Sequence, residues 1–318
     1  MKQINLPSLP SSWESLTGRQ MIEINRLRRL SKSEQEFYFR VFCYLSGIVQ
    51  IHGVVYSRKG SPLFCFRQVG PKGKPCGESF HMEAWQVHEA VGQYLSWLST
   101  PCNRVSQVLP LLTMPDGRSF SDAGYAMTKM TYQQHQYAQR YFSEIQRTEI
   151  QLTHEYFSDS PDKERMSQLI DYLRRSRRLF MATVYTPPCH VSSKTVDGKM
   201  VVYDIPQTDY VFGTGQIHRE EQAFSSVAEE IIDATLQHFH GVMLHYQRIY
   251  PKLFKEGAAG NTDPIRVEES TLNILQSELK FSNYQTIYDS NAPFILGKLH
   301  AIILKGEEIE RMNSKMKH

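Results

Sequence analysis

The sequence predicts a mainly α-helical protein, a multi-helix bundle with one or two small β-hairpin insertions. Three observations support this class. Apolar residues recur at intervals of three and four over several long stretches, as they do on the buried face of a helix. Helix start signals, in which Ser or Thr precedes Gln or Glu by three residues, occur repeatedly. β-branched segments bounded by turn residues are confined to two short regions, about 48–82 and about 186–206.

The N-terminal part, residues 1–130, is expected to be a helical domain that carries the first hairpin. Thr17 with Gln20, and Ser31 with Glu34, are two candidate capping boxes, because each hydroxyl can accept a first-turn N–H while the longer side chain reaches back. The hairpin has a basic tip rich in Gly and Pro. A further helix over 82–99 is expected to bury four residues: Trp85, Val91, Leu95 and Leu98.

The central part, residues 131–260, is expected to be a second helical domain. Thr131 and Gln134 form a third capping box, which opens a long helix to about residue 157. A second helix follows over 163–185, then the short hairpin, and then one helix over 219–250.

The C-terminal part, residues 261–318, is expected to be a helical module with explicit start signals. Asp263 precedes Pro264, a residue favoured at the first helical position. Ser282 is expected to cap a short helix and Ser290 the last one. The apolar residues of the last helix follow a 4-3-7 spacing that is too short for a sustained coiled coil: Ile295, Leu299, Ile302 and Ile309.

Composition excludes several classes of protein. The chain has 318 residues, of which 41% are hydrophobic, so it can build a core. Its formal charge of +3 is nearly balanced and indicates no particular partner. Five irregularly spaced cysteines without a CxxC pair favour a reducing compartment, and we expect a cytoplasmic protein. No apolar run reaches the ~18 residues of a membrane span, so we expect no membrane partner.

No pattern of catalytic or metal-binding residues is evident. Structural zinc sites bring their ligands in close pairs, and the candidate set has intervening gaps of ten, four and six residues: Cys65, Cys76, His81 and His88. The common nucleophile, dinucleotide and deaminase motifs are absent together. We therefore expect a non-enzymatic chain without cofactor or metal. The enzymatic alternative is an unrecognised site around Cys76, His81 and His190.

One basic cluster indicates an alternative function. Cations are favoured near the end of a helix, where the expected helix over 163–185 carries Arg174, Arg175, Arg177 and Arg178. Together with Lys72 and Lys74 at the hairpin tip, these arginines could contact phosphates. A nucleic-acid-binding accessory protein is therefore the alternative to a protein-binding one.

Several segments resemble helical tail-morphogenesis proteins of tailed phages and prophages, including tail-assembly chaperones. The opening resembles their Pro-x-Ser-Trp-x-x-Leu-Thr start, with Trp13 and Leu16 beside the first helix. A second segment resembles a helix end of the type Leu-x-x-Ala-x-x-Tyr-x-Pro, here from Leu179 to Pro187. A third, residues 274–310, resembles a module in which a Tyr-centred turn leads to a last helix. These segments cover about a third of the chain, and the insertion at about 48–82 has no counterpart.

The resemblance implies an assembly or chaperone-like protein that binds another tail component in the host cytoplasm while particles form. A partner helix would then lie in an apolar groove between helices. The residues expected either to face this partner or to lie in the core are Trp13, Ile295, Leu299 and Ile302.

Overall fold

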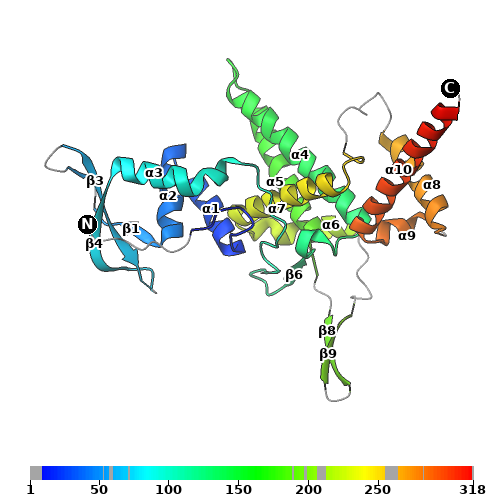
Figure 1. The fold of residues 1–318 in the computed structure, drawn as a ribbon, viewed down its shortest axis with the longest axis horizontal. Coiled ribbons are helices and arrows are strands. Elements are labelled where there is room, and N and C mark those ends of the chain that lie inside the picture. Colours follow the sequence, from blue (N-terminus) through cyan, green and yellow to red (C-terminus); the bar gives the residue numbers. More distant parts are fainter. Residues whose placement is uncertain are drawn as a thin grey trace. The chain divides into compact units, whose positions relative to one another are not determined.

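The protein is mainly α-helical, as predicted. The computed structural model describes residues 9–52, 54–56, 60–70, 72–187, 190–196, 199–205, 213–254, 264–281 and 283–316. Helices make up 63% of it, and the described part contains ten α-helices and small antiparallel sheets. Each expected hairpin region forms a small sheet (Figure 1).

The chain folds as two compact units, where the sequence indicated three parts. Unit 1 comprises Met1–Arg104 and Glu229–Gly241, and unit 2 comprises Val105–Ala228 and Val242–His318. The elements of unit 1 are α1 (Gly18–Leu30), α2 (Glu34–Ser46), β1 (Ile48–Gln50), β2 (Val55–Tyr56), β3 (Pro62–Val69), β4 (Pro75–Glu83), α3 (Ala84–Leu95), the 3-10 turn η1 (Ser96–Ser99) and the first part of α7 (Glu229–Ile249).

The start of α1 confirms one predicted capping box and the start of α2 corrects another. The Thr17 hydroxyl accepts the N–H of Gln20, and the Gln20 side chain accepts the N–H of Thr17. The cap of α2 is Ser33, which accepts from the N–H of Glu36, and Ser31 instead ends α1. Both serines have extended backbone, but only Ser33 lies directly before the first residue of α2.

The sheet of unit 1 is a β3–β4 hairpin flanked by β1 and β2, which both pair with β3. The predicted hairpin is confirmed, and Phe66 on β3 is fully buried. The helix after it corrects one core prediction. Leu95 and Leu98 are buried as expected, but Trp85 is 59% exposed, and Val87 takes a buried position near the start of α3.

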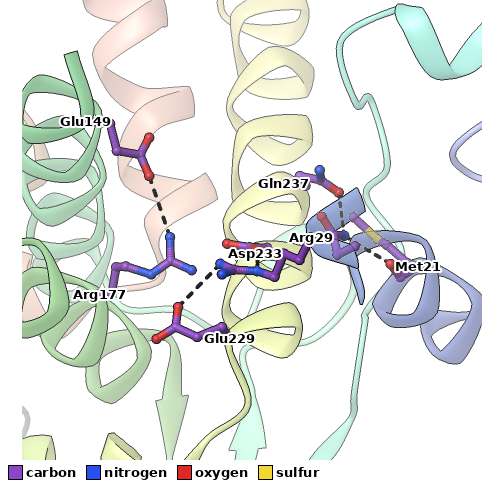
Figure 2. A network of polar contacts seen from close by, with 8 residues as sticks. Met21, Arg29, Glu149, Arg177, Glu229, Asp233 and Gln237 are labelled. Carbon is purple, nitrogen blue, oxygen red and sulfur yellow. Dashed lines mark hydrogen bonds and ion pairs between the residues drawn. The ribbon is translucent and has the colours of Figure 1, made fainter. Parts of the chain in front are cut away.

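Polar contacts join α1 to the first part of α7 within unit 1 (Figure 2). The Asn25 side chain donates to the Gln237 side chain at 3.0 Å. One turn further along α1, Arg29 pairs with Asp233 at 2.6 Å and with Glu229 at 3.4 Å. Residues four apart share a helix face, so these contacts form one antiparallel ladder.

Unit 2 is built around a helical hairpin. Its elements are β5 (Leu111–Thr113), β6 (Ser119–Asp122), the 3-10 turn η2 (Tyr125–Met127), α4 (Tyr132–Tyr156), α5 (Lys163–Val184), β7 (Tyr185–Thr186), β8 (His190–Val196), β9 (Lys199–Ile205), α6 (Thr214–Glu220), the 3-10 turn η3 (Glu221–Ser226), the second part of α7, α8 (Pro264–Leu279), α9 (Tyr284–Asp289) and α10 (Ala292–Met316). Helices α4 and α5 follow one another in the chain and pack along each other (Figure 1).

Both starts of the hairpin helices have side-chain caps. The predicted capping box of Thr131 and Gln134 opens α4 and is confirmed. Asp162 opens α5 by accepting from the N–H groups of Glu164 and Arg165. The turn between the helices is short, so the two helices are antiparallel.

The expected single helix over 219–250 is broken. The backbone is extended at Val227 and Ala228, so 3-10 turn η3 ends and α7 begins at Glu229. The hydroxyls of Ser225 and Ser226 donate to carbonyl oxygens three residues earlier, and this local bonding competes with helix propagation. The predicted hairpin at about 186–206 is confirmed, because Val196 pairs with Lys199 and the ladder continues to His190 and Ile205.

The last three helices follow the predicted order with shifted caps. Helix α8 begins at Pro264 as expected, while the predicted caps Asp263 and Ser282 lie outside the described residues. Asn283 caps α9 by accepting from the N–H of Thr286. Before α10, the side chain of Asn291 accepts from the N–H of Phe294, so the predicted cap at Ser290 is one residue too early.

Candidate interaction surface

Two of the four residues expected to face a partner or the core lie in the core. Trp13 is 5% exposed, its indole N–H donates to the carbonyl of Thr100 at 3.0 Å, and its ring meets Trp97 edge-on. Ile295 is fully buried at the start of α10. Neither side chain offers surface to a partner while its unit is folded.

Leu299 and Ile302 mark the end of the packed part of α10. Both are half-buried, and every described side chain from Ile303 to Lys315 is exposed. The apolar residues of this terminal half are exposed as well: Ile303, Leu304, Ile309 and Met312. The terminal half of α10 is therefore an uncovered amphipathic segment.

Neither unit assembles the predicted basic patch into one surface. Lys72 and Lys74 are exposed on the β3–β4 hairpin of unit 1, whereas the four arginines lie on α5 of unit 2. Each guanidinium group lies near a carboxylate: Arg174 at 3.7 Å from Asp171, Arg175 at 3.6 Å and Arg178 at 3.0 Å from Glu221, and Arg177 at 3.6 Å from Glu149. Arg177 is also only 7% exposed. Each arginine of this run therefore has a carboxylate neighbour within unit 2, although Arg174 and Arg175 remain more than half exposed.

The residues of the enzymatic alternative belong to different units. Cys76 and His81 lie on β4 of unit 1, whereas His190 begins β8 of unit 2. In the ladder, Cys76 pairs with Gln68 and His81 with Cys65. Within the described residues, no three His, Cys, Asp or Glu side chains are grouped so that they could hold a metal ion.

Among the residues of unit 2 whose burial the structure describes, the outer half of the α4–α5 hairpin is the longest stretch without buried side chains. From residue 149 to residue 175, all of which the structure describes, no residue is buried. Large apolar side chains are nevertheless present and exposed there: Ile150, Tyr156, Phe157 and Tyr172. Phe157 is 77% exposed and Ile150 is 67% exposed. Ordinary surface helices place such residues against a core.

A groove follows one face of α4 in this outer half. It has a volume of about 950 Å³, and its described lining residues come from α4 and the turn after it: Gln146, Glu149, Ile150, Thr153, His154, Phe157, Ser158 and Asp159. Ile150 and Phe157 are seven residues apart, so they lie two turns apart on the same face. The sequence predicted this helix but not its exposed apolar face; the buried face includes Ala138, Tyr141 and Ile145.

The described lining of the groove is acidic. It includes two carboxylates, Glu149 and Asp159, and neither lysine nor arginine. Glu149 is 50% exposed and pairs with Arg177 at 3.6 Å (Figure 2). Half of this side chain is exposed, so a donor from another molecule can reach its carboxylate.

Two buried groups of unit 2 have strongly shifted pKa values but do not line the groove. Burial raises the pKa of Asp122 to about 7 and lowers the pKa of His135 to about 4. Shifted groups indicate catalysis when a cleft gives a substrate access to them. Asp122 and His135 are both buried, and we assign them a role in stability rather than in a site.

Comparisons with known proteins add no family. No family model matches this chain, and no curated protein or solved structure matches it either. None of the helices in the described part is both long and apolar enough to span a bilayer.

Proposed function

We propose that this chain is a non-enzymatic interaction protein that binds another protein through the outer half of its α4–α5 hairpin. One observation carries the proposal: a stretch of 27 residues, from 149 to 175, buries no side chain and still exposes Ile150, Tyr156, Phe157 and Tyr172. Covering an exposed Ile or Phe stabilises a complex by about 1.5–3 kcal/mol per side chain. Ile150 and Phe157 line the same groove, and contiguous exposed apolar surface marks interaction sites.

The resemblance to tail-morphogenesis proteins supports a narrower version of this proposal. The partner would then be another tail component, bound in the host cytoplasm during assembly. The nucleic-acid alternative has less support, because the arginines on which it depends are paired with Asp171, Glu221 and Glu149.

Site-specific photo-crosslinking in the native host tests the proposal. Phe157 is replaced by benzoylphenylalanine in one variant, and Tyr56 of β2, which is 70% exposed, in a matched control. We expect one protein to be crosslinked at position 157 and not at position 56. Equal capture at both positions, or none at 157, would refute the proposal. A gel shift of DNA or RNA at low salt would instead favour the nucleic-acid alternative.

A further inference from the structure

We infer that the groove on α4 receives a single amphipathic α-helix whose apolar stripe is flanked by basic residues. This inference rests on the proposed function and specifies the chemistry of the partner. It follows from the spacing of the lining residues, the size of the groove and the charge around it.

The spacing of the lining residues fits a helix. Gln146, Ile150, Thr153 and Phe157 follow intervals of four, three and four, the spacing at which one helix meets another along its length. The buried face of α4, from Ala138 to Thr148, has intervals of three, four and three. At 100° per residue the two stripes are about 130° apart around α4. Helix α4 therefore has one stripe that is buried and a second stripe, with the same helical spacing, that is not covered.

The size of the groove fits a short helical segment. A helix about 10 Å wide occupies roughly 420 Å³ per turn of 5.4 Å. The volume of about 950 Å³ thus corresponds to about two turns. The two apolar positions of the lining, Ile150 and Phe157, are also two turns apart, so each could contact one apolar side chain of the incoming helix.

The charge of the groove selects the flanks of that helix. Glu149 lies next to Ile150 in the chain and Asp159 lies two residues after Phe157. Arg177 pairs with Glu149 at 3.6 Å, and the described lining itself contributes no lysine or arginine. Lysine or arginine beside the apolar stripe would meet these carboxylates, whereas glutamate would be repelled. Complementary charge acts mainly on specificity and association rate, so the preference should be largest at low salt.

Binding of designed peptides to the full-length protein tests this inference by fluorescence anisotropy. The probe is a labelled amphipathic peptide of about 14 residues, or four turns, with leucines at heptad spacing and lysines beside them. One control peptide has glutamates in place of the lysines, and another has a central proline that breaks the helix. We expect the lysine peptide to bind about fivefold more tightly than the glutamate peptide at low salt, with a smaller difference at high salt.

Variants of the protein locate the binding. Phe157→Ser should raise the Kd of the lysine peptide about tenfold, because exposed anchors contribute most of the affinity. Asp159→Asn should roughly halve the preference for lysine over glutamate. Tyr56→Ser, at a comparably exposed position, should change neither value. Both unit 2 positions are exposed, and circular dichroism would verify that the variants are folded.

Three outcomes would overturn the inference. The glutamate peptide could bind as tightly as the lysine peptide, or the proline peptide could bind as tightly as the intact helix. The protein could also form a dimer that Phe157→Ser dissociates, which would make a second copy the occupant. If crosslinking at position 157 succeeds while the peptides show no preference, this inference fails alone. If crosslinking and peptide binding both fail, this inference and the proposed function both fail.

Discussion

Asp122 and His135 give unit 2 two opposite pH dependences of stability, and we predict that they cancel between about pH 4 and pH 6.5. Asp122 ends β6 and is buried, and the nearby N–H groups of Gly124 and Ala123 do not meet the geometry of full hydrogen bonds. Burial therefore raises the pKa of Asp122 from its ordinary 3.8 to about 7. Burial also lowers the pKa of His135, on α4, from 6.5 to about 4.

The signs follow from where the protons are bound. The folded chain holds the Asp122 proton more tightly than the unfolded chain, so this contribution to stability is complete below pH 3.8 and is lost as the pH rises through about 7. The contribution of His135 is complete above pH 6.5 and is lost as the pH falls through about 4. Between these limits the unfolded chain carries one proton on His135, and the folded chain carries one on Asp122. The number of bound protons is equal, so these two groups produce no net slope.

Removing either group should expose the slope of the other. In Asp122→Asn, the free energy of unfolding should rise with pH by about 1.4 kcal/mol per pH unit, or about 3 kcal/mol from pH 4 to pH 6.5. In His135→Gln it should fall with the same slope, by about 4 kcal/mol between pH 4 and pH 7. Above pH 7 the Asn variant should be more stable than the wild type, because it no longer buries a carboxylate charge.

Hydrogen exchange of the α4 amides across this pH range measures the effect within unit 2. Differences between variant and wild type at each pH remove the contribution of the other titrating groups. All three tryptophans, Trp13, Trp85 and Trp97, are in unit 1, so their fluorescence follows the other unit in the same samples. If Asp122→Asn keeps the pH profile of the wild type, the burial argument is wrong.

Three further predictions concern backbone and packing. Gly241→Ala should destabilise unit 1 by about 3 kcal/mol, because a β-carbon would overlap the backbone of Arg104. Gly92→Ala has open space around it and should stabilise unit 1 by about 0.5–1 kcal/mol. Urea unfolding followed by tryptophan fluorescence measures both changes. A chain that ends after Ile302 should leave unit 2 folded. A chain that ends before Asn291 loses buried residues of α10, and its free energy of unfolding should fall by several kcal/mol. Far-UV circular dichroism during heating measures both. Ala126→Gly should stabilise unit 2 by about 0.5–1 kcal/mol in the same melts, because Ala126 has a φ of 48°.

The elements that the sequence predicted well are those fixed by local chemistry. The capping boxes at Thr17 and Thr131 involve only four residues each, and both are confirmed. Caps were misplaced where polar residues compete nearby, as Asn291 does with Ser290. The break before α7 depends on serine hydroxyls that bond to the backbone, which the apolar period does not reveal.

The return of residues 229–241 to unit 1 could not be predicted from the sequence. It depends on contacts between residues about two hundred positions apart, such as Arg29 with Asp233 and Asn25 with Gln237. Each of these polar side chains is also typical of a solvated helix face. Only the fold brings the two sets of polar residues together.

The proposed interaction surface was missed for a related physical reason. An apolar residue at helical spacing needs to be covered, but the spacing does not say whether its own chain or another molecule covers it. Trp13 and Ile295 satisfied the pattern of partner-facing residues and are covered by their own units. Ile150 and Phe157 satisfy the same pattern, and their own chain leaves them exposed. The distinction lies in the α4–α5 hairpin, whose outer half extends beyond the buried part of unit 2. A helix that is longer than the core it packs on leaves its last apolar residues available to another protein.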